Sequence, residues 1–191
     1  VDKDVQFLIR EELIKYNEIF KTKGSSAILM DVRNGEIFSL VSLPDFNPNK
    51  REKISDSRFI NRATKGVYEF GSIFKTFTLA AALNEKMIEP KTEFKNLPKS
   101  LTCAGFPIRE YDEKIPSDLT AEQILIRSGN IGSVRIAQNM GIEKTKKFLD
   151  SLNLLTPIEF DLGEIGKPLL LKWGKCKLAT VSFGHGISTT P

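Results

Sequence analysis

The sequence predicts an α+β fold in which helices flank an antiparallel sheet. Three observations lead to it: an amphipathic pattern over residues 5–20, an Asn-Gly pair between two runs rich in Ile, Leu and Val, and helical patterns that dominate from residue 72 onward. The chain has 191 residues, of which 40% are hydrophobic and 27% charged, and such a chain is long enough for one sizeable core. We therefore expect a folded domain.

The first third of the chain predicts a helix followed by a hairpin. Residues 5–20, VQFLIREELIKYNEIF, place apolar side chains at three- and four-residue spacing, which is typical of an amphipathic helix. Residues 26–32 and 35–43 are short apolar runs joined through Asn34-Gly35, a pair that favours a tight turn between antiparallel strands. The polar segment 44–57 contains two prolines, so we expect a loop there.

The rest of the chain is predicted to be mostly helical. A helix of about 14 residues is expected to start near Ser72 and, because it is apolar on nearly all sides, to lie at the centre of the fold. Residues 91–118 contain a glycine and three prolines and are predicted to be irregular. Later helices are expected over residues 119–128, 131–140, 142–154 and 177–184, with an extended segment at 163–175.

Composition excludes several classes of function. The net charge is +4, and the lysines are scattered without interleaved aromatic residues, so no nucleic-acid partner is expected. No apolar run approaches the ~18–20 residues that a membrane span needs. The opening residues VDKDVQF do not resemble a signal peptide, so we expect that any targeting segment was removed or was never there.

The two cysteines and the single histidine make a poor zinc site. The serine–lysine chemistry considered below requires no metal or organic cofactor, so none is expected. Cys103 and Cys176 are not in a Cys-x-x-Cys arrangement, and so few cysteines favour two unpaired thiols, although an oxidising compartment would allow a disulfide. His185 stands between two glycines, which favours a turn or packed histidine.

Ser72 and Lys75 form the first candidate site. Residues three apart on a helix share a face, so the Lys75 amine is predicted to lie near the Ser72 hydroxyl. A lysine whose pKa is lowered by burial can take the proton of a serine nucleophile. The alternative is that Ser72 merely caps the helix. The glycines at 66 and 71 imitate a phosphate loop, but serine stands where that loop needs lysine.

Ser128-Gly129-Asn130 is the second candidate, in a turn between two predicted helices. A hydroxyl there could relay a proton to a leaving amine, and an amide could hold a peptide group. A second Ser-x-Asn, at Ser151 and Asn153, is interpreted as a helix end.

The two motifs together resemble the class B penicillin-binding proteins, which are peptidoglycan D,D-transpeptidases. The flanking sequences carry the same resemblance: MDVRNGEIFSLVSLPDFNPN, NRATKGVYEFGSIFK and FGHGISTTP. They resemble the cell-division branch of that class more than the elongation branch. The resemblance covers nearly the whole chain. It implies the fold that these proteins share with serine β-lactamases. It also implies that Ser72 attacks the D-Ala-D-Ala bond of a stem peptide, Lys75 takes its proton, Ser128 passes a proton to the leaving nitrogen, and Asn130 orients the substrate and the Lys75 amine.

The chain departs from the family pattern in two places. Phe70 stands where proline is common, and no Lys-Ser/Thr-Gly, the family's third motif, occurs. Residues 1–191 are therefore expected to be the N-terminal part of a transpeptidase domain, without the C-terminal strands, the membrane anchor and the N-terminal non-catalytic domain, and with little turnover alone. A β-lactam sensor, a serine β-lactamase-like enzyme and a non-catalytic interaction domain of the same fold remain alternatives.

The resemblance also implies partners and a compartment. The substrates would be peptidoglycan stem peptides, and β-lactam antibiotics would acylate Ser72. A septal glycosyltransferase and other division proteins would be partners. The parent protein would hold a single N-terminal anchor in the inner membrane, with this domain in the periplasm.

Overall fold

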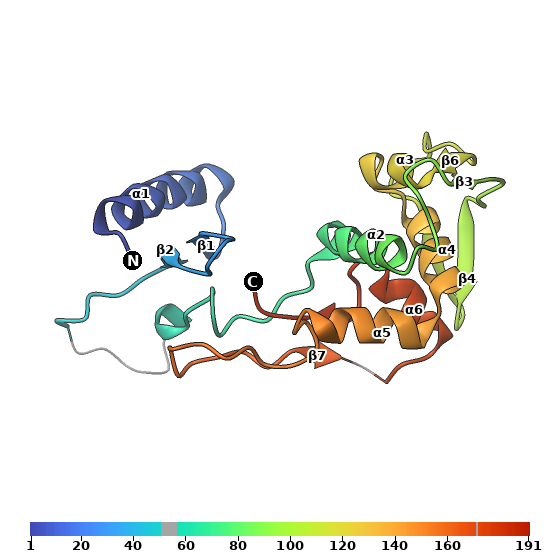
Figure 1. Ribbon diagram of the computed structural model, residues 1–191. Helices are drawn as coiled ribbons and strands as arrows, with labels where there is room; N and C mark the ends of the chain where they lie inside the picture. Colours follow the sequence, from blue (N-terminus) through green and yellow to red (C-terminus); the bar gives the residue numbers. More distant parts are fainter. Residues whose placement is uncertain (51–56, 171) are drawn as a thin grey trace. The chain divides into compact units, whose positions relative to one another are not determined.

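The computed structural model describes residues 1–50, 57–170 and 172–191 (Figure 1). The chain forms two compact units, which are described separately. The first unit comprises residues 1–67, 159–167 and 190–191, and the second comprises residues 68–158 and 168–189. Each unit combines helices with antiparallel strand pairs, so the predicted α+β class is confirmed.

The first unit contains a helix that lies along a β-hairpin (Figure 1). The helix α1 (Lys3–Phe20) begins at Asp2, whose carboxylate accepts hydrogen bonds from two N–H groups of the first turn. The strands β1 (Ser25–Met30) and β2 (Ile37–Leu43) pair antiparallel. Gly35, with a φ of 77°, provides the left-handed backbone that the turn between them requires. The hairpin predicted from the Asn-Gly pair is therefore confirmed.

The end of the first unit is only partly described. The loop predicted over residues 44–57 runs into a short 3₁₀ helix, η1 (Ser57–Phe59), and residues 51–56 of that prediction lie outside the described residues. Much later in the chain, Gly166 closes onto this unit, because its N–H donates to the Thr64 carbonyl at 2.8 Å.

The second unit is built around the helix α4. Its helices are α2 (Lys75–Asn84), α3 (Ala121–Ile126), α4 (Asn130–Met140), α5 (Ile142–Ser151) and α6 (Lys175–Val181). The helix α4 contacts each of the other four (Figure 1). The predicted helices are thus present with shifted ends, but the most central one is not the helix that follows Ser72.

The position of α2 corrects that expectation. One side of α2 is buried, including Leu79, Ala81 and Ala82, whereas Leu83 is 42% exposed. The small alanine side chains made α2 appear apolar on all sides in the sequence, but small residues also allow one face to approach α4 closely while the other faces solvent.

Three short strand pairs complete the second unit. They are β3 (Glu93–Phe94) with β6 (Leu119–Thr120), β4 (Ser100–Cys103) with β5 (Phe106–Arg109), and β7 (Leu169–Leu170) with β8 (Ile187–Ser188). The prediction that residues 91–118 are irregular is therefore wrong for residues 93–94, 100–103 and 106–109, and it holds for the rest of the segment. The chain reverses between β4 and β5 at Ala104-Gly105, both of which have positive φ.

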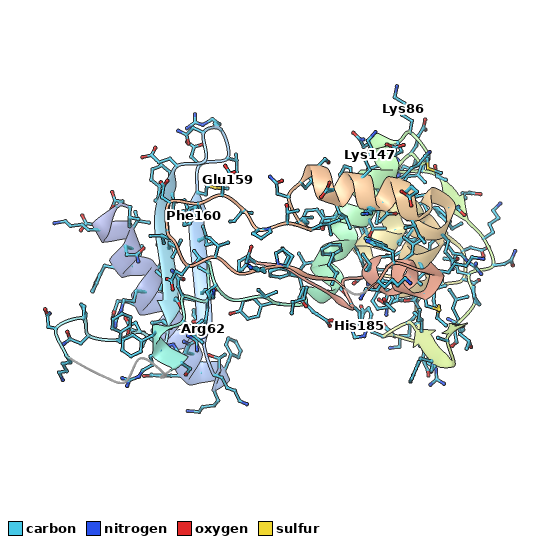
Figure 2. The ribbon with its side chains drawn as sticks, turned by 90° about the horizontal axis from the view of Figure 1, so that it is seen from below. Arg62, Lys86, Lys147, Glu159, Phe160 and His185 are labelled. Atoms are coloured by element: carbon cyan, nitrogen blue, oxygen red, sulfur yellow. A yellow bond between two sulfur atoms is a disulfide. The ribbon has the colours of Figure 1, made fainter. Side chains whose placement is uncertain are left out.

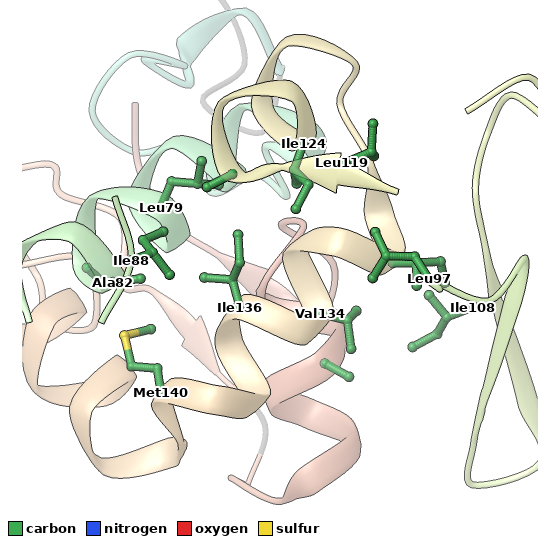
Figure 3. Packing of buried hydrophobic residues seen from close by; sticks show 14 of the residues in the cluster. Leu79, Ala82, Ile88, Leu97, Ile108, Leu119, Ile124, Val134, Ile136 and Met140 are labelled. Carbon is green, nitrogen blue, oxygen red and sulfur yellow. The ribbon is translucent and has the colours of Figure 1, made fainter. Parts of the chain in front are cut away.

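The main core lies between α2, α3 and α4. Figure 3 shows Leu79 of α2 and Ile124 of α3 on the side of α4 from which Ile136 projects, and Val134 of α4 belongs to the same cluster. Ile124 and Val134 are completely buried. Burying such a side chain stabilises the fold by about 1.5–3 kcal/mol. This core fixes the end of α3 relative to the start of α4, where the second candidate motif lies.

Candidate active site

The segment that leads to Ser72 is held by main-chain contacts with the segment after α6. Tyr68 and Thr189 exchange two N–H···O bonds of 2.9 and 3.1 Å, and the Gly71 N–H donates to the Gly184 carbonyl at 3.2 Å. Both glycines have positive φ, 57° and 77°. A Cβ atom on Gly184 would overlap the Gly71 carbonyl. The backbone just before Ser72 is therefore positioned by main-chain hydrogen bonds. The two backbones approach so closely at Gly184 that only glycine fits there.

Ser72 lies in a 3₁₀ turn and not in the α-helix itself. The turn η2 spans Gly71–Phe74, and α2 begins at Lys75. The residues that cap the turn and the helix are Phe70 and Phe74, and neither cap involves a side-chain hydrogen bond. The alternative that Ser72 is a helix cap is therefore wrong. Because side chains three apart are eclipsed in a 3₁₀ turn, Lys75 points back toward Ser72.

Lys75 forms hydrogen bonds with two of the other three predicted site residues, Ser72 and Ser128. Its Nζ donates to Ser72 Oγ at 3.2 Å, to Ser128 Oγ at 2.9 Å and to the Ser128 carbonyl at 2.5 Å. Lys75 is 1% exposed, whereas Ser72 is exposed. The arrangement therefore places a buried amine directly beneath a hydroxyl that solvent or a ligand can reach.

Burial changes the proton affinity of this amine. Loss of solvent lowers the pKa of Lys75 to about 8, and the negative charge of Glu110 opposes that shift. A lysine with such a pKa is partly neutral at physiological pH and can accept the proton of a neighbouring hydroxyl.

Ser128 and Asn130 occupy the junction between α3 and α4. Ser128 has a φ of 53°, a conformation that L-residues seldom adopt, and its carbonyl and hydroxyl both face Lys75. Asn130 is the first residue of α4, and its Nδ2 donates to the Arg109 carbonyl at 2.8 Å. The structure thus gathers Ser72, Lys75 and Ser128, and it places Asn130 next to them with its amide bound to β5.

Glu110 belongs to this site but was not singled out in the sequence. Its two carboxylate oxygens accept hydrogen bonds from the N–H groups of Asn130, at 2.6 Å, and Ile131, at 2.9 Å. No sequence signal could have identified it, because it lies 20 residues before the helix that it caps. A lone acidic residue in a polar segment ordinarily faces solvent.

The structure joins Cys103 to Cys176 by a disulfide, so the expectation of two unpaired cysteines is wrong. The bond ties the end of β4 to α6, although the two cysteines lie 73 positions apart in the sequence. Both cysteines also line a cavity of about 670 Å³ that reaches Asn130. Lys172 and Lys177 contribute cationic side chains to the same lining. The cavity therefore offers room and positive charge beside the candidate motif.

His185 lies in the turn after α6, as predicted, and its exposed side chain is labelled in Figure 2. Its Nδ1 lies 3.0 Å from a carboxylate oxygen of Glu69, and the other oxygen of Glu69 accepts the Gly186 N–H at 2.7 Å.

Ser151 is the last residue of α5, with its hydroxyl bound to the Phe148 carbonyl at 2.7 Å, which confirms that this second Ser-x-Asn marks a helix end.

Within residues 1–50, 57–170 and 172–191, no three His, Cys, Asp or Glu side chains gather as a metal site would require. Over the same residues, none of the helices combines the length and the apolar character needed to cross a membrane.

Comparisons with known proteins agree on one family. The family model described as the penicillin binding protein transpeptidase domain matches residues 25–191. A probable peptidoglycan D,D-transpeptidase FtsI of Caulobacter vibrioides is 31% identical over 192 residues, which cover 100% of this chain and 32% of that protein. The chain thus spans about a third of the length of that relative.

Solved structures agree with the sequence comparisons. A peptidoglycan glycosyltransferase structure from Burkholderia ambifaria has a TM-score of 0.85 at 27% identity, and the match covers 100% of this chain and 56% of that one. The transpeptidase (TP) domain of Burkholderia pseudomallei penicillin-binding protein 3 gives 0.84 at 26% identity, covering 100% and 53%.

Proposed function

Because the chain belongs to the family of penicillin-binding protein transpeptidase domains, we propose that it carries the acylating half of a serine D,D-transpeptidase that cross-links peptidoglycan stem peptides. One observation carries the proposal: the exposed Ser72 hydroxyl lies 3.2 Å from the amine of Lys75, which is itself 1% exposed. The fold expected from the resemblance is confirmed by the likeness to the two Burkholderia structures.

In the proposed reaction, the neutral amine of Lys75 takes the proton of Ser72 as its Oγ attacks the carbonyl carbon of the D-Ala-D-Ala bond. An ester forms on Ser72, the C–N bond breaks, and the terminal D-Ala leaves as an amine. A second stem peptide's amino group then attacks the ester, which forms the cross-link and restores the hydroxyl. With a pKa of about 8, about a tenth of the Lys75 side chains would be neutral at about pH 7.

Ser128 and Asn130 have supporting roles in this proposal. The Ser128 hydroxyl lies 2.9 Å from the Lys75 amine, so it can return a proton from Lys75 to the leaving nitrogen. Asn130 borders the cavity of about 670 Å³, so its amide is available to hold a peptide group of the substrate once it gives up the Arg109 carbonyl.

The active form is proposed to contain more than residues 1–191. The relatives and the two solved chains are longer than this chain, which supports the proposal that a Lys-Ser/Thr-Gly strand completes the domain, with an N-terminal domain and a single membrane anchor elsewhere in the protein. That strand would hold the substrate carboxylate and complete the oxyanion hole. Loss of one oxyanion donor alone typically lowers the rate by ~10²–10³.

The compartment is proposed to be the periplasm, with the parent protein anchored in the inner membrane. The Cys103–Cys176 disulfide supports this, because such bonds persist mainly in oxidising compartments. Septal cell-wall synthesis, with a glycosyltransferase and other division proteins as partners and β-lactams as inhibitors, is proposed from the resemblance of the sequence to the division branch.

The test is intact mass after incubation with a penicillin. The proteins compared are this chain, a longer version that continues past Pro191, and Ser72→Ala variants of both. We expect a penicilloyl adduct on the longer version and none on its Ser72→Ala variant. A penicilloyl adduct on the Ser72→Ala variant would show that another residue is the nucleophile. A folded longer version that takes no label would exclude acyl transfer and favour a binding role.

A further inference from the structure

The start of α4 is capped by a residue from outside the helix. The residue before α4 is Gly129, which has no side chain to satisfy the free N–H groups of the first turn. Glu110 takes that role, accepting the N–H of Asn130 at 2.6 Å and that of Ile131 at 2.9 Å. A carboxylate at this end of a helix is also favoured by the helix dipole.

The same hairpin holds the side chain of Asn130. Glu110 directly follows Arg109, the last residue of β5, and the Arg109 carbonyl accepts the Asn130 Nδ2 at 2.8 Å. The backbone and the side chain of Asn130 are thus both bound by two consecutive residues of one strand end. The disulfide at Cys103 attaches this hairpin to α6, so the support is itself anchored.

The turn that Glu110 holds is conformationally demanding. Ser128 keeps a φ of 53°, and its carbonyl and hydroxyl must both face the Lys75 amine. A non-glycine residue in this region of backbone space persists only when its surroundings fix it. Ser128 is fixed on one side by the Gly129 N–H, which bonds to the Ile124 carbonyl at 2.8 Å, and on the other by the capped start of α4.

We propose that Glu110 is a positioning residue of the active site, which holds the Ser128–Asn130 turn in the geometry that binds Lys75. It acts through the main chain of α4 and through its charge, and it does not contact the substrate. The consequence for catalysis rests on the function proposed above, whereas the structural role does not.

The charge of Glu110 gives the proposal a second measurable consequence. The negative charge of Glu110 raises the pKa of Lys75, whereas burial lowers it. The residues that hydrogen-bond to the Lys75 amine, Ser72 and Ser128, are uncharged. Glu110→Gln keeps one acceptor oxygen but removes the charge. The pH at which Lys75 loses its proton should therefore fall in this variant.

The experiment compares Glu110→Ala, Glu110→Gln and the control Glu113→Gln, which removes a carboxylate from an exposed residue of the same segment. Hydrogen exchange of the Asn130 and Ile131 amides in this 191-residue chain is the first readout. We expect it to be about tenfold faster or more in Glu110→Ala and unchanged in the control. Unchanged exchange in Glu110→Ala would overturn the structural role, whether or not the chain acylates.

Penicillin acylation as a function of pH is the second readout, on the longer version of the protein. We expect Glu110→Ala to lower the limiting rate at high pH by about tenfold to a hundredfold, because small displacements of catalytic groups have such effects. Glu110→Gln should move the midpoint of the profile to lower pH. Faster exchange with a limiting rate and midpoint that match the parent would show a structural cap only and overturn the positioning role. A parent that takes no label would contradict the proposed function, while the exchange result would still decide the role of Glu110.

Discussion

Lys75→Met should change how the stability of the second unit depends on pH. In the folded chain burial lowers the pKa of Lys75 to about 8, whereas an unfolded lysine titrates near about 10.4. Between these values the unfolded chain holds a proton that the folded chain has released. The free energy of unfolding of the parent should therefore rise with pH across this window and not change for this reason below it.

The size of the effect follows from the two pKa values. One pKa unit corresponds to about 1.4 kcal/mol, so the buried ammonium costs the parent about 3 kcal/mol at about pH 7. About 2 kcal/mol of that cost should disappear by about pH 9.5. The difference in unfolding free energy between the parent and Lys75→Met should shift by this amount in favour of the parent.

Urea denaturation at both pH values, followed through the single tryptophan, is a suitable assay. Trp173 packs against the core cluster of Phe74 and Val181, so its fluorescence reports the unfolding of the second unit. The control is Lys147→Met, which removes an exposed lysine from α5 (Figure 2). If Lys75→Met and the parent gave parallel stability curves between these pH values, the reasoning that burial sets the proton affinity of Lys75 would be refuted.

Three further perturbations test the packing around the site. Gly184→Ala should lower the free energy of unfolding by about 1–3 kcal/mol, because the new Cβ would overlap a main-chain carbonyl; wild-type stability would contradict the close approach. Ile131 is fully buried in α4, so Ile131→Ala should lower the free energy of unfolding by about 2–5 kcal/mol. Ile126 is 73% exposed, so Ile126→Ala should lower it far less. Equal losses of unfolding free energy in urea denaturation would contradict the assigned core. Replacing Cys103 and Cys176 by serine should cost about 4 kcal/mol, since the bond closes a 73-residue loop; a parent whose urea midpoint does not change on adding dithiothreitol would contradict the disulfide.

Local patterns in the sequence predicted the local parts of the fold. The hairpin could be predicted from Asn34-Gly35 because the connection between its strands is short, residues 31–36, and needs a left-handed residue, which Gly35 provides. The start of the helix predicted over residues 119–128 is also determined locally, because Thr120 forms a full capping box with Gln123. The proximity of Ser72 and Lys75 was also a local prediction, since they lie three positions apart.

Features that depend on distant parts of the chain could not be predicted in this way. The contact of Gly71 with Gly184 joins segments that are far apart in the sequence, and the pairing of Cys103 with Cys176 depends on how β4 meets α6. The cap that Glu110 provides is of the same kind. The hairpin of β4 and β5 was missed because its strands have four residues each and its turn, Ala104-Gly105, lacks the strong Asn-Gly signal.

The contact between Gly71 and Gly184 has a consequence for how the site can vary under selection. Main-chain atoms hold Ser72 in place, so the neighbouring side chains are not needed to position it. Ile73, which is 67% exposed, and Phe70 should therefore tolerate substitution. Substitution of Gly184 is disfavoured, since every other amino acid would add a Cβ atom that overlaps the Gly71 carbonyl. In a library of random variants selected for a stably folded chain, substitutions should therefore accumulate at Phe70 and Ile73, while Gly184 stays unchanged.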